Sequence, residues 1–261
     1  AARRQKSLLP TYDVFDEVRH FEPAAENQPV RFKGRRLGIT ICEDAWNDEA
    51  FWGKRLYRAD PVARQVKAGA DLLVNISASP FETGKLGFRR GLVAGHARRH
   101  GVPFFYCAQV GGNDELVFDG YSFAVDGRGR TAAAARGFAE DLVIADSDAP
   151  GRAAFPEREP VADLHDALVL GIKDYAAKCG FEAALIGLSG GIDSAVTCAL
   201  AVSALGPARV LGVSMPSMYS SEGSVTDAVA LSRNLGTELV SLPIKGPYEA
   251  LMRSLEGAFR G

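Results

Sequence analysis

Short apolar runs alternate with amphipathic stretches along the first half of the chain. Runs rich in β-branched and apolar residues at 36–42, 71–77 and 102–108 predict buried strands. Between them, residues 60–70 and 87–100 have the apolar spacing of helices. This alternation predicts sheets covered by outer helices.

Two further apolar runs follow, at 121–126 and 141–146, and each predicts a strand. The dipeptide Asp126-Gly127 predicts a hairpin turn after the first of them. Residues 149–162 combine prolines, a glycine and mixed charge, which is typical of a linker. The sequence therefore predicts one domain over 1–148, a linker over 149–162 and a second domain over 163–261.

Strands and helices alternate regularly in the second domain. The helix predicted at 163–179 ends at Gly180. The remaining pattern predicts strands at 183–188, 209–214 and 238–242, and helices at 194–205, at 224–235 and from 247. Such alternation is typical of a parallel sheet with helices on both faces.

Composition narrows the class of protein. The 261 residues are 47% hydrophobic and 24% charged, with a net charge of −2, as expected for a globular protein of one large or two ordinary domains. This charge gives no reason to expect nucleic acid or an anionic membrane as a partner. No apolar run approaches the ~18 residues of a membrane span. The chain lacks an initiator Met, and we expect it to be cut at both ends.

The four cysteines do not form a metal or redox motif. Cys42, Cys107, Cys179 and Cys198 include no CxxC pair. We expect Cys107, Cys179 and Cys198, which lie in apolar surroundings, to be buried and reduced in a cytoplasmic protein.

The run from Ser189 to Ser194, Ser-Gly-Gly-Ile-Asp-Ser, follows a predicted buried strand and opens a predicted helix. The unpaired N–H groups at a helix start attract anions, and glycines let the backbone approach them closely. Asp193 would repel phosphate unless Mg²⁺ lay between them. The run lacks the GK[ST] ending of a P-loop, and a capped glycine turn without a ligand is the alternative.

This run resembles the SGGxDS loop of the ATP pyrophosphatase superfamily, and residues 167–175 and 212–221 resemble NAD synthetase. The resemblance implies that ATP is cleaved to AMP and pyrophosphate here, with Mg²⁺ at Asp193. The ATP-binding residues that it implies are Gly187, Leu188, Ser189, Gly190, Gly191, Ile192, Asp193, Ser194 and Met215.

Cys42 ends a predicted strand and precedes Glu43 and Asp44. A cysteine nucleophile needs a nearby base or cation, and otherwise an unpaired cysteine is most often a core residue. The four histidines (His20, His96, His100 and His165) lie in polar contexts that predict surface positions. Lys6 is the alternative partner for the cysteine.

The segments 6–17 and 41–44 resemble the nitrilase family, in its glutamine amidase branch fused to NAD synthetase. The resemblance implies that Cys42 attacks the glutamine amide and that Lys6 and the backbone N–H of Glu43 stabilise the oxyanion. It further implies that Tyr12, Ser79 and Lys85 bind glutamine; Glu17 is a weaker candidate for orienting Lys6.

The two resemblances together imply an α/β protein. Its first part would be the C-terminal part of a nitrilase-like α-β-β-α sandwich, followed by the first part of a Rossmann-like parallel sheet. The implied reaction is ATP-dependent amidation of deamido-NAD to NAD with ammonia from glutamine. Glutamine, ATP and deamido-NAD would be the partners of a cytoplasmic homo-oligomer.

Two alternatives stay open: another amidotransferase of the superfamily, and a nitrilase-like amidohydrolase with a nucleotide-binding module. The family's triad also contains a glutamate before the lysine, and this chain begins five residues before Lys6. We therefore expect the chain by itself to hydrolyse glutamine negligibly and to bind nucleotide without completing the reaction.

Overall fold

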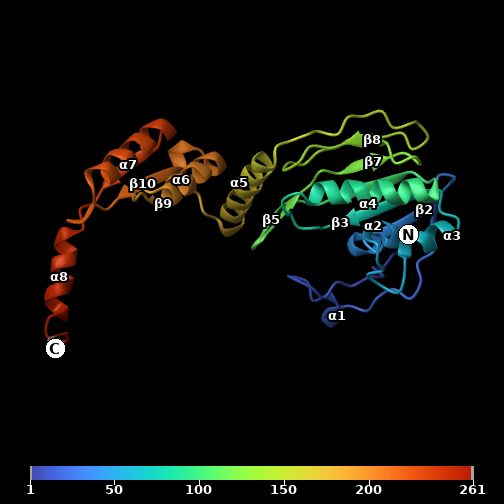
Figure 1. Ribbon diagram of the computed structural model, residues 1–261, viewed down its shortest axis with the longest axis horizontal. Helices are drawn as coiled ribbons and strands as arrows, with labels where there is room; N and C mark the ends of the chain where they lie inside the picture. The colour runs from blue at the N-terminus through green and yellow to red at the C-terminus, as the bar shows by residue number, and fades with distance from the viewer. Residues whose placement is uncertain (1, 260–261) are drawn as a thin grey trace. The chain divides into compact units, whose positions relative to one another are not determined.

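The computed structural model describes residues 2–259, which form two compact units. The first comprises 2–111 and 115–167, and the second comprises 112–114 and 168–259. Figure 1 shows the elements of each unit along the chain.

A six-stranded mixed sheet forms the first unit, in the order β1-β2-β3-β4-β7-β8. The three central strands β2, β3 and β4 are parallel, and the outer strands are antiparallel to their neighbours. The strands are β1 (Val30–Phe32), β2 (Arg35–Ile41), β3 (Leu72–Ser77), β4 (Phe104–Ala108), β7 (Phe123–Val125) and β8 (Thr131–Ala134). The carboxyl ends of β2, β3 and β4 therefore meet at one edge.

Two helices pack on one face of this sheet. Helix α3 (Pro61–Lys67) lies against β2, and α4 (Lys85–His100) lies against β4 and β7. Figure 1 shows α4 running along the sheet. Val62, Leu73, Ala97 and Phe104 are fully buried between the layers. The structure therefore contains one helical layer and one sheet of the predicted sandwich.

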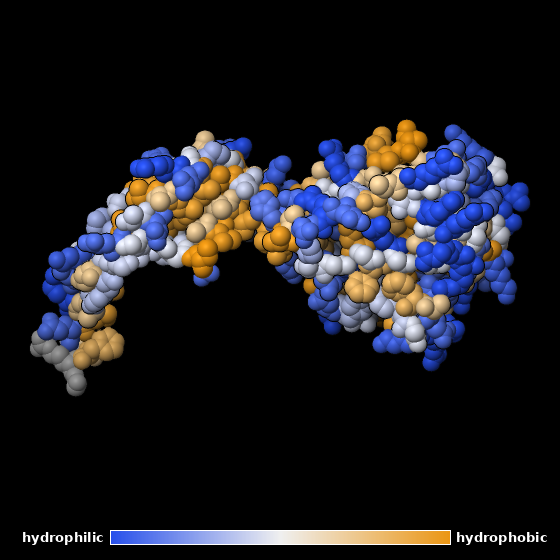
Figure 2. Space-filling view, turned by 45° about the horizontal axis from the view of Figure 1, so that its top comes forward, coloured by the Kyte–Doolittle hydropathy of each residue, from blue (hydrophilic) through white to orange (hydrophobic). Residues whose placement is uncertain are grey.

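Several minor elements complete the first unit, and 141–146 is not among its strands. The minor elements are α1 (Glu17–His20), the 3₁₀ helix η1 (Cys42–Ala45), α2 (Glu49–Trp52), and β5 (Val110–Asn113) with β6 (Leu116–Asp119) as a separate two-stranded sheet. The strand prediction for 141–146 is wrong, because no neighbouring strand pairs with this segment within the described residues. Leu142 and Ile144 are 89% and 90% exposed, as expected for residues outside a sheet. Figure 2 shows that apolar surface is present on both units.

The segment 149–159 has no regular secondary structure, yet it packs on the first unit. Phe155 is buried in the same core as Phe123 and Tyr121. The N–H of Ala153 donates to the carbonyl of Thr131 at 3.0 Å. This segment is therefore held by a side chain and a backbone hydrogen bond.

The second unit has a parallel sheet in the order β11-β10-β9, which confirms the parallel sheet predicted there. Its elements are α5 (Pro160–Cys179), whose residues up to Ala167 belong to the first unit, β9 (Ala184–Gly187), α6 (Ile192–Leu205), η2 (Pro207–Arg209), β10 (Val210–Ser214), α7 (Glu222–Leu235), β11 (Glu238–Ser241) and α8 (Lys245–Leu255).

Both crossover helices of this sheet, α6 and α7, contribute to a single core around Cys198, Ala201 and Ala228. They therefore lie on the same face of this sheet. The strand order explains this, since it advances in one direction and both crossovers turn the same way. Leu185 on β9 is 67% exposed.

Three burial predictions are also wrong. Cys107 and Cys179 are exposed, whereas Cys198 is buried as expected. Cys107 alternates along β4 with the buried Phe104 and Tyr106, so it points from the other face. His96, expected at the surface, is fully buried.

His96 is held by a hydrogen bond in the core. Its ring Nε2 lies 2.8 Å from the carbonyl oxygen of Ala45, and its Nδ1 lies 3.8 Å from an Asp48 carboxylate oxygen. Burial lowers the pKa of His96 in spite of these acceptors, and the neighbouring Arg99 lowers it further. The folded chain therefore favours the neutral imidazole.

No described helix is both long enough and apolar enough to cross a membrane.

We predict that the first unit loses stability as the pH falls below about 6.5, the ordinary pKa of histidine. The unfolded chain takes up protons there more readily than the buried His96, so stability is complete above that pH and is lost below it. Thermal melting between pH 7.5 and about 5 measures this loss. His96→Gln, which keeps a donor for Ala45, should reduce the pH dependence, whereas His165→Gln at an exposed site should not. Equal slopes for all three proteins would contradict the prediction.

Candidate functional site

Cys42 occupies a strained position at the carboxyl end of β2. It opens η1 with φ of 45°, in the left-handed region that side chains other than glycine rarely adopt. This conformation costs about 1–2 kcal/mol. The turn leaves the next N–H, that of Glu43, without an intrahelical partner, as at any helix start. Strain at a reactive side chain is typical of a functional position.

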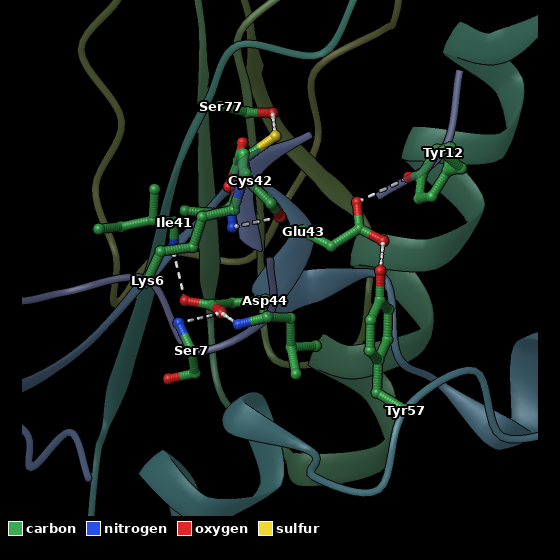
Figure 3. Close-up of polar contacts among 12 residues, drawn as sticks. Lys6, Ser7, Tyr12, Ile41, Cys42, Glu43, Asp44, Tyr57 and Ser77 are labelled. Atoms are coloured by element: carbon green, nitrogen blue, oxygen red, sulfur yellow. Dashed lines mark hydrogen bonds and ion pairs between the residues drawn. The ribbon is translucent and has the colours of Figure 1, made fainter. Parts of the chain in front are cut away.

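Asp44 joins the Cys42 turn to the segment that carries Lys6. One carboxylate oxygen accepts the N–H groups of Ser7 and Leu8, both at 2.8 Å, and the other accepts that of Ile41 at 3.0 Å (Figure 3). Asp44 is 1% exposed. Burial raises its pKa, although the three donors and Lys6 oppose that shift. The fixed carboxylate sets the distance between the two segments.

Lys6 and Cys42 line the same cavity of about 850 Å³, together with Glu17 and Ser77. The Lys6 ammonium donates to both oxygens of Glu17 at 2.7 Å. The two side chains are 14% and 23% exposed, so the pair is largely shielded. The structure thus places the weaker candidate, Glu17, against Lys6.

Glu43 holds two tyrosines on the other side of the turn. Its carboxylate oxygens accept from the hydroxyls of Tyr12 and Tyr57, both at 2.8 Å (Figure 3). Burial and the Glu43 charge raise the pKa of both tyrosines, which therefore stay protonated and donate. Tyr12 is fixed beside the nucleophile, but it does not line the cavity that Lys6 and Cys42 share.

The other two predicted glutamine-binding residues lie near this turn but have no contact with Cys42. Ser79 is buried just beyond the end of β3. The Lys85 ammonium lies 5.8 Å from the ring centroid of Trp46, the residue that follows η1. It also pairs with Glu82 at 3.7 Å. The structure therefore brings Lys6 and Cys42 into one cavity, whereas Tyr12, Ser79 and Lys85 are not among the residues that line it.

Sequence reasoning missed two polar side chains on the neighbouring strand β3 that form hydrogen bonds with Cys42. Asn75 donates to the Cys42 carbonyl at 3.3 Å and to Thr40 at 3.0 Å. The Ser77 hydroxyl donates to the Cys42 sulfur at 3.6 Å. Both lie near the carboxyl end of β3, the parallel neighbour of β2. Polar residues at adjacent parallel strand ends were the available signal.

The second candidate site is the loop between β9 and α6. The Ser189 and Ser194 hydroxyls lie 3.2 Å apart, and Ser194 donates to the Gly191 carbonyl at 2.9 Å. The N–H of Gly191 donates to Ser189 at 3.2 Å. These bonds close the loop on itself at the start of a 14-residue helix, where unpaired N–H groups favour an anion.

Gly190 and Met215 fit the predicted loop environment. Gly190 has φ of 81°, and a Cβ there would lie 2.5 Å from the Ser224 backbone. A Cβ on Gly187 would lie 3.6 Å from the Met215 side chain, so the two predicted residues are neighbours. Leu188 is buried, whereas the other predicted residues of the loop are at least partly exposed.

Asp193 lies exposed in the first turn of α6, and no hydrogen bond or ion pair of its carboxylate is found among the described residues. No group of three or more His, Cys, Asp or Glu side chains that could hold a metal is found in residues 2–259. A single carboxylate suits a Mg²⁺ ion that also binds phosphate oxygens and waters. It does not suit an ion held by protein ligands alone.

Comparison with known families identifies both parts. Residues 1–157 match the family model described as carbon-nitrogen hydrolase. The chain belongs to the carbon-nitrogen hydrolase family. Residues 164–259 match the model described as NAD synthase. The predicted order, a nitrilase-type part followed by an NAD synthetase-type part, is confirmed.

The chain is similar to several glutamine-dependent NAD(+) synthetases. It is 48% identical to that of Synechocystis over 94% of this chain and 45% of the relative, and 36% identical to that of Thermotoga maritima over 98% and 50%. The structure of glutamine-dependent NAD+ synthetase from Acinetobacter baumannii with ADP superposes with a TM-score of 0.89 at 34% identity, covering 98% of this chain and 48% of that one. The chain spans about half the length of the curated relatives it matches.

We predict that Asp44→Asn detaches the Lys6 segment. The amide keeps one acceptor oxygen but turns an NH₂ group toward backbone N–H groups, which leaves a buried donor unpaired at about 1–3 kcal/mol. Denaturant unfolding measures the loss, and hydrogen exchange should rise at the amides of Ser7 and Leu8. Asp13→Asn, an exposed change in the same segment, is the control. Unchanged exchange in Asp44→Asn would contradict the clamp.

A second prediction concerns the glycine loop. Gly190→Ala should destabilise the second unit by about 2 kcal/mol or more, because the methyl group meets backbone atoms of Ser224 at a positive φ. It should also abolish the binding of Mg-ATP, measured by titration calorimetry. Gly191→Ala is the control for stability, since its Cβ would meet only the Ser189 hydroxyl at 3.3 Å. Equal stability of the two variants would refute the steric argument.

Proposed function

We propose that the protein amidates deamido-NAD to NAD, using ATP and ammonia taken from glutamine. The observation that carries this proposal is the pairing of two sites in one chain. A strained cysteine shares a cavity with a Lys–Glu pair in the first unit, and a closed serine-glycine loop opens a helix in the second. The similarity to glutamine-dependent NAD(+) synthetases supports the same order of sites.

At the first site, the Cys42 thiolate attacks the carbon of the glutamine side-chain amide. Lys6 and the backbone N–H of Glu43 stabilise the resulting oxyanion, and such a donor contributes roughly 3–4 kcal/mol in other acyl-transfer enzymes. The C–N bond breaks, ammonia leaves, and water hydrolyses the thioester to glutamate. Tyr12, Ser79 and Lys85 bind the rest of the glutamine.

At the second site, the loop holds ATP. The residues proposed to bind it are Gly187, Leu188, Ser189, Gly190, Gly191, Ile192, Asp193, Ser194 and Met215. Asp193 would hold Mg²⁺ together with phosphate oxygens. The nicotinate carboxylate attacks the α-phosphorus, pyrophosphate leaves, and ammonia then displaces AMP.

We extend the proposal to the organisation of the protein. Residues 1–148 are the glutamine amidase, 149–162 the connection and 163–261 the synthetase part of a homo-oligomer. The cytoplasm is the proposed location, because a reducing compartment suits the four unpaired cysteines.

Covalent capture tests the first site without requiring turnover, which we expect to be negligible in this chain. Azaserine, a diazo analogue of glutamine, should alkylate Cys42, and L-glutamine should protect it. Lys6→Met should slow capture roughly tenfold or more. Lys67→Met, on the exposed side of α3, is the matched control.

Peptide mass spectrometry locates the adduct, with the exposed Cys179, which does not line this cavity, as the internal reference. Labelling that glutamine does not prevent, or equal labelling of all exposed cysteines, would contradict the proposed amidase. Where turnover is measurable, glutamine labelled at the amide nitrogen should pass its label to NAD with an equal amount of AMP. Glutamate release without AMP would favour the amidohydrolase alternative.

A further inference from the structure

Cys42 is backed by a row of polar side chains that runs across the sheet. The Cys42 sulfur lies 3.6 Å from the Ser77 hydroxyl, which lies 2.8 Å from the Tyr106 hydroxyl. These residues sit at or near the carboxyl ends of the adjacent parallel strands β2, β3 and β4. In Figure 3 the sulfur points toward Ser77, away from Glu43 and its tyrosines.

Beyond Tyr106 lies a buried ion pair. Arg89, on α4, is 1% exposed and bonds both oxygens of Asp119, one of them at 2.9 Å from Nη1. The positive charge of Arg89 acts on the Tyr106 hydroxyl and opposes the rise in its pKa that burial causes. Burying two charges is expensive, and an apolar pair of similar size is often as stable. Packing alone therefore does not account for a cation at this position.

The hydrogen bonds in this row all point the same way. Burial raises the pKa of Tyr106, so its hydroxyl keeps its proton. The Tyr106 hydroxyl donates its proton to the oxygen of Ser77 at 2.8 Å, and the positive charge of Arg89 acts on the phenol oxygen. Since Ser77 already accepts from Tyr106, its own proton is free for the Cys42 sulfur. Aligned bonds of this kind polarise one another in a low-dielectric interior.

We propose that Ser77 and Tyr106 form a hydrogen-bond chain, backed by the positive charge of Arg89, that stabilises the Cys42 thiolate and fixes the direction of its sulfur. This inference rests on the proposed glutamine amidase and adds a second source of activation beside Lys6. Ser77 acts on the sulfur directly, whereas Tyr106 and Arg89 are positioning residues. On acylation the sulfur loses its negative charge. The hydrogen-bond chain therefore stabilises the free Cys42 thiolate more than the thiol or the acylated cysteine.

The proposed hydrogen-bond chain predicts a dependence of Cys42 reactivity on pH that packing around the cysteine alone would not produce. Only a thiolate reacts with iodoacetamide, so the rate of alkylation against pH reports how readily Cys42 ionises. The titratable or charged groups that line the cavity with Cys42 are Arg4, Lys6, Glu17, His20, Glu22 and Cys107. Glu43, Tyr12, Tyr57 and Tyr106 act on the site through their charges or hydrogen bonds. Removing the Ser77 hydroxyl leaves all of these in place.

The experiment measures alkylation of Cys42 by peptide mass spectrometry across a pH series, with exposed Cys179 as the internal reference. Ser77→Ala should slow alkylation at neutral pH about threefold to tenfold and raise the pH of half-maximal rate by roughly 0.5–1 unit. Tyr106→Phe should shift the profile in the same direction by less.

Tyr121→Phe is the matched control. Tyr121 is 2% exposed in the same core, but its hydroxyl bonds Asp163 at 2.8 Å and does not touch the row. This variant should leave the profile unchanged. An unaltered profile in both Ser77→Ala and Tyr106→Phe overturns the proposal. So does an equal shift in all three variants, because that outcome reports general loosening of the core.

This measurement is independent of glutamine. If azaserine fails to capture Cys42 in the unaltered protein while Ser77→Ala still shifts the alkylation profile, the amidase proposal fails and the hydrogen-bond chain stands. If capture succeeds and neither variant shifts the profile, the amidase proposal stands and the chain is refuted.

Discussion

The carboxylate of Asp44 is the interaction on which the first site depends. It collects three backbone N–H groups from two segments that lie far apart in the sequence: Ser7 and Leu8 from one, Ile41 from the other. Besides this clamp, a hydrogen bond from Tyr12 to Glu43 ties the Lys6 segment to the Cys42 turn, and Leu8 and Leu9 are buried. A carboxylate suits this task because its two oxygens can accept several donors at once. Its burial also keeps water from competing for those donors.

The polar groups in the core of the first unit belong to the same arrangement. Thr40, Asn75 and Ser77 take the places on β2 and β3 that point toward the helices, where apolar side chains would give a simpler core. Each has a hydrogen-bond partner that leads toward Cys42 or its carbonyl. Burying a polar group is tolerable only when it is bonded. Near the site, hydrogen bonds that fix Cys42 thus take the place of apolar contacts in the core of the sheet.

The accuracy of the sequence predictions differs between local and distant features. Apolar runs located the central strands and α4 because each is set by its own periodicity. The same reasoning failed at 141–146, since an apolar run becomes a strand only where a neighbour offers hydrogen bonds. His96 was misplaced because polar sequence neighbours say nothing about the helix face that a residue occupies. The contact of Glu17 with Lys6 was reached only through the family resemblance, and that of Ser77 with Cys42 was missed, because local patterns do not encode tertiary contacts.

The turns that follow β2 and β9 differ in the residue that adopts the positive φ and in what stabilises it. At the end of β2 the backbone turns at φ of 45° with a cysteine in place, because the chemistry proposed there needs a side chain at that point. In the loop after β9 the turn falls on Gly190 at φ of 81°, where the Ser224 backbone leaves no room for a Cβ. The first turn must therefore be stabilised from outside, by Asp44 and Asn75. The second needs only short-range bonds between Ser189, Ser194 and Gly191. The strained turn at Cys42 is thus supported by side chains outside the turn's first residue, whereas the glycine loop is closed by hydrogen bonds among its own residues.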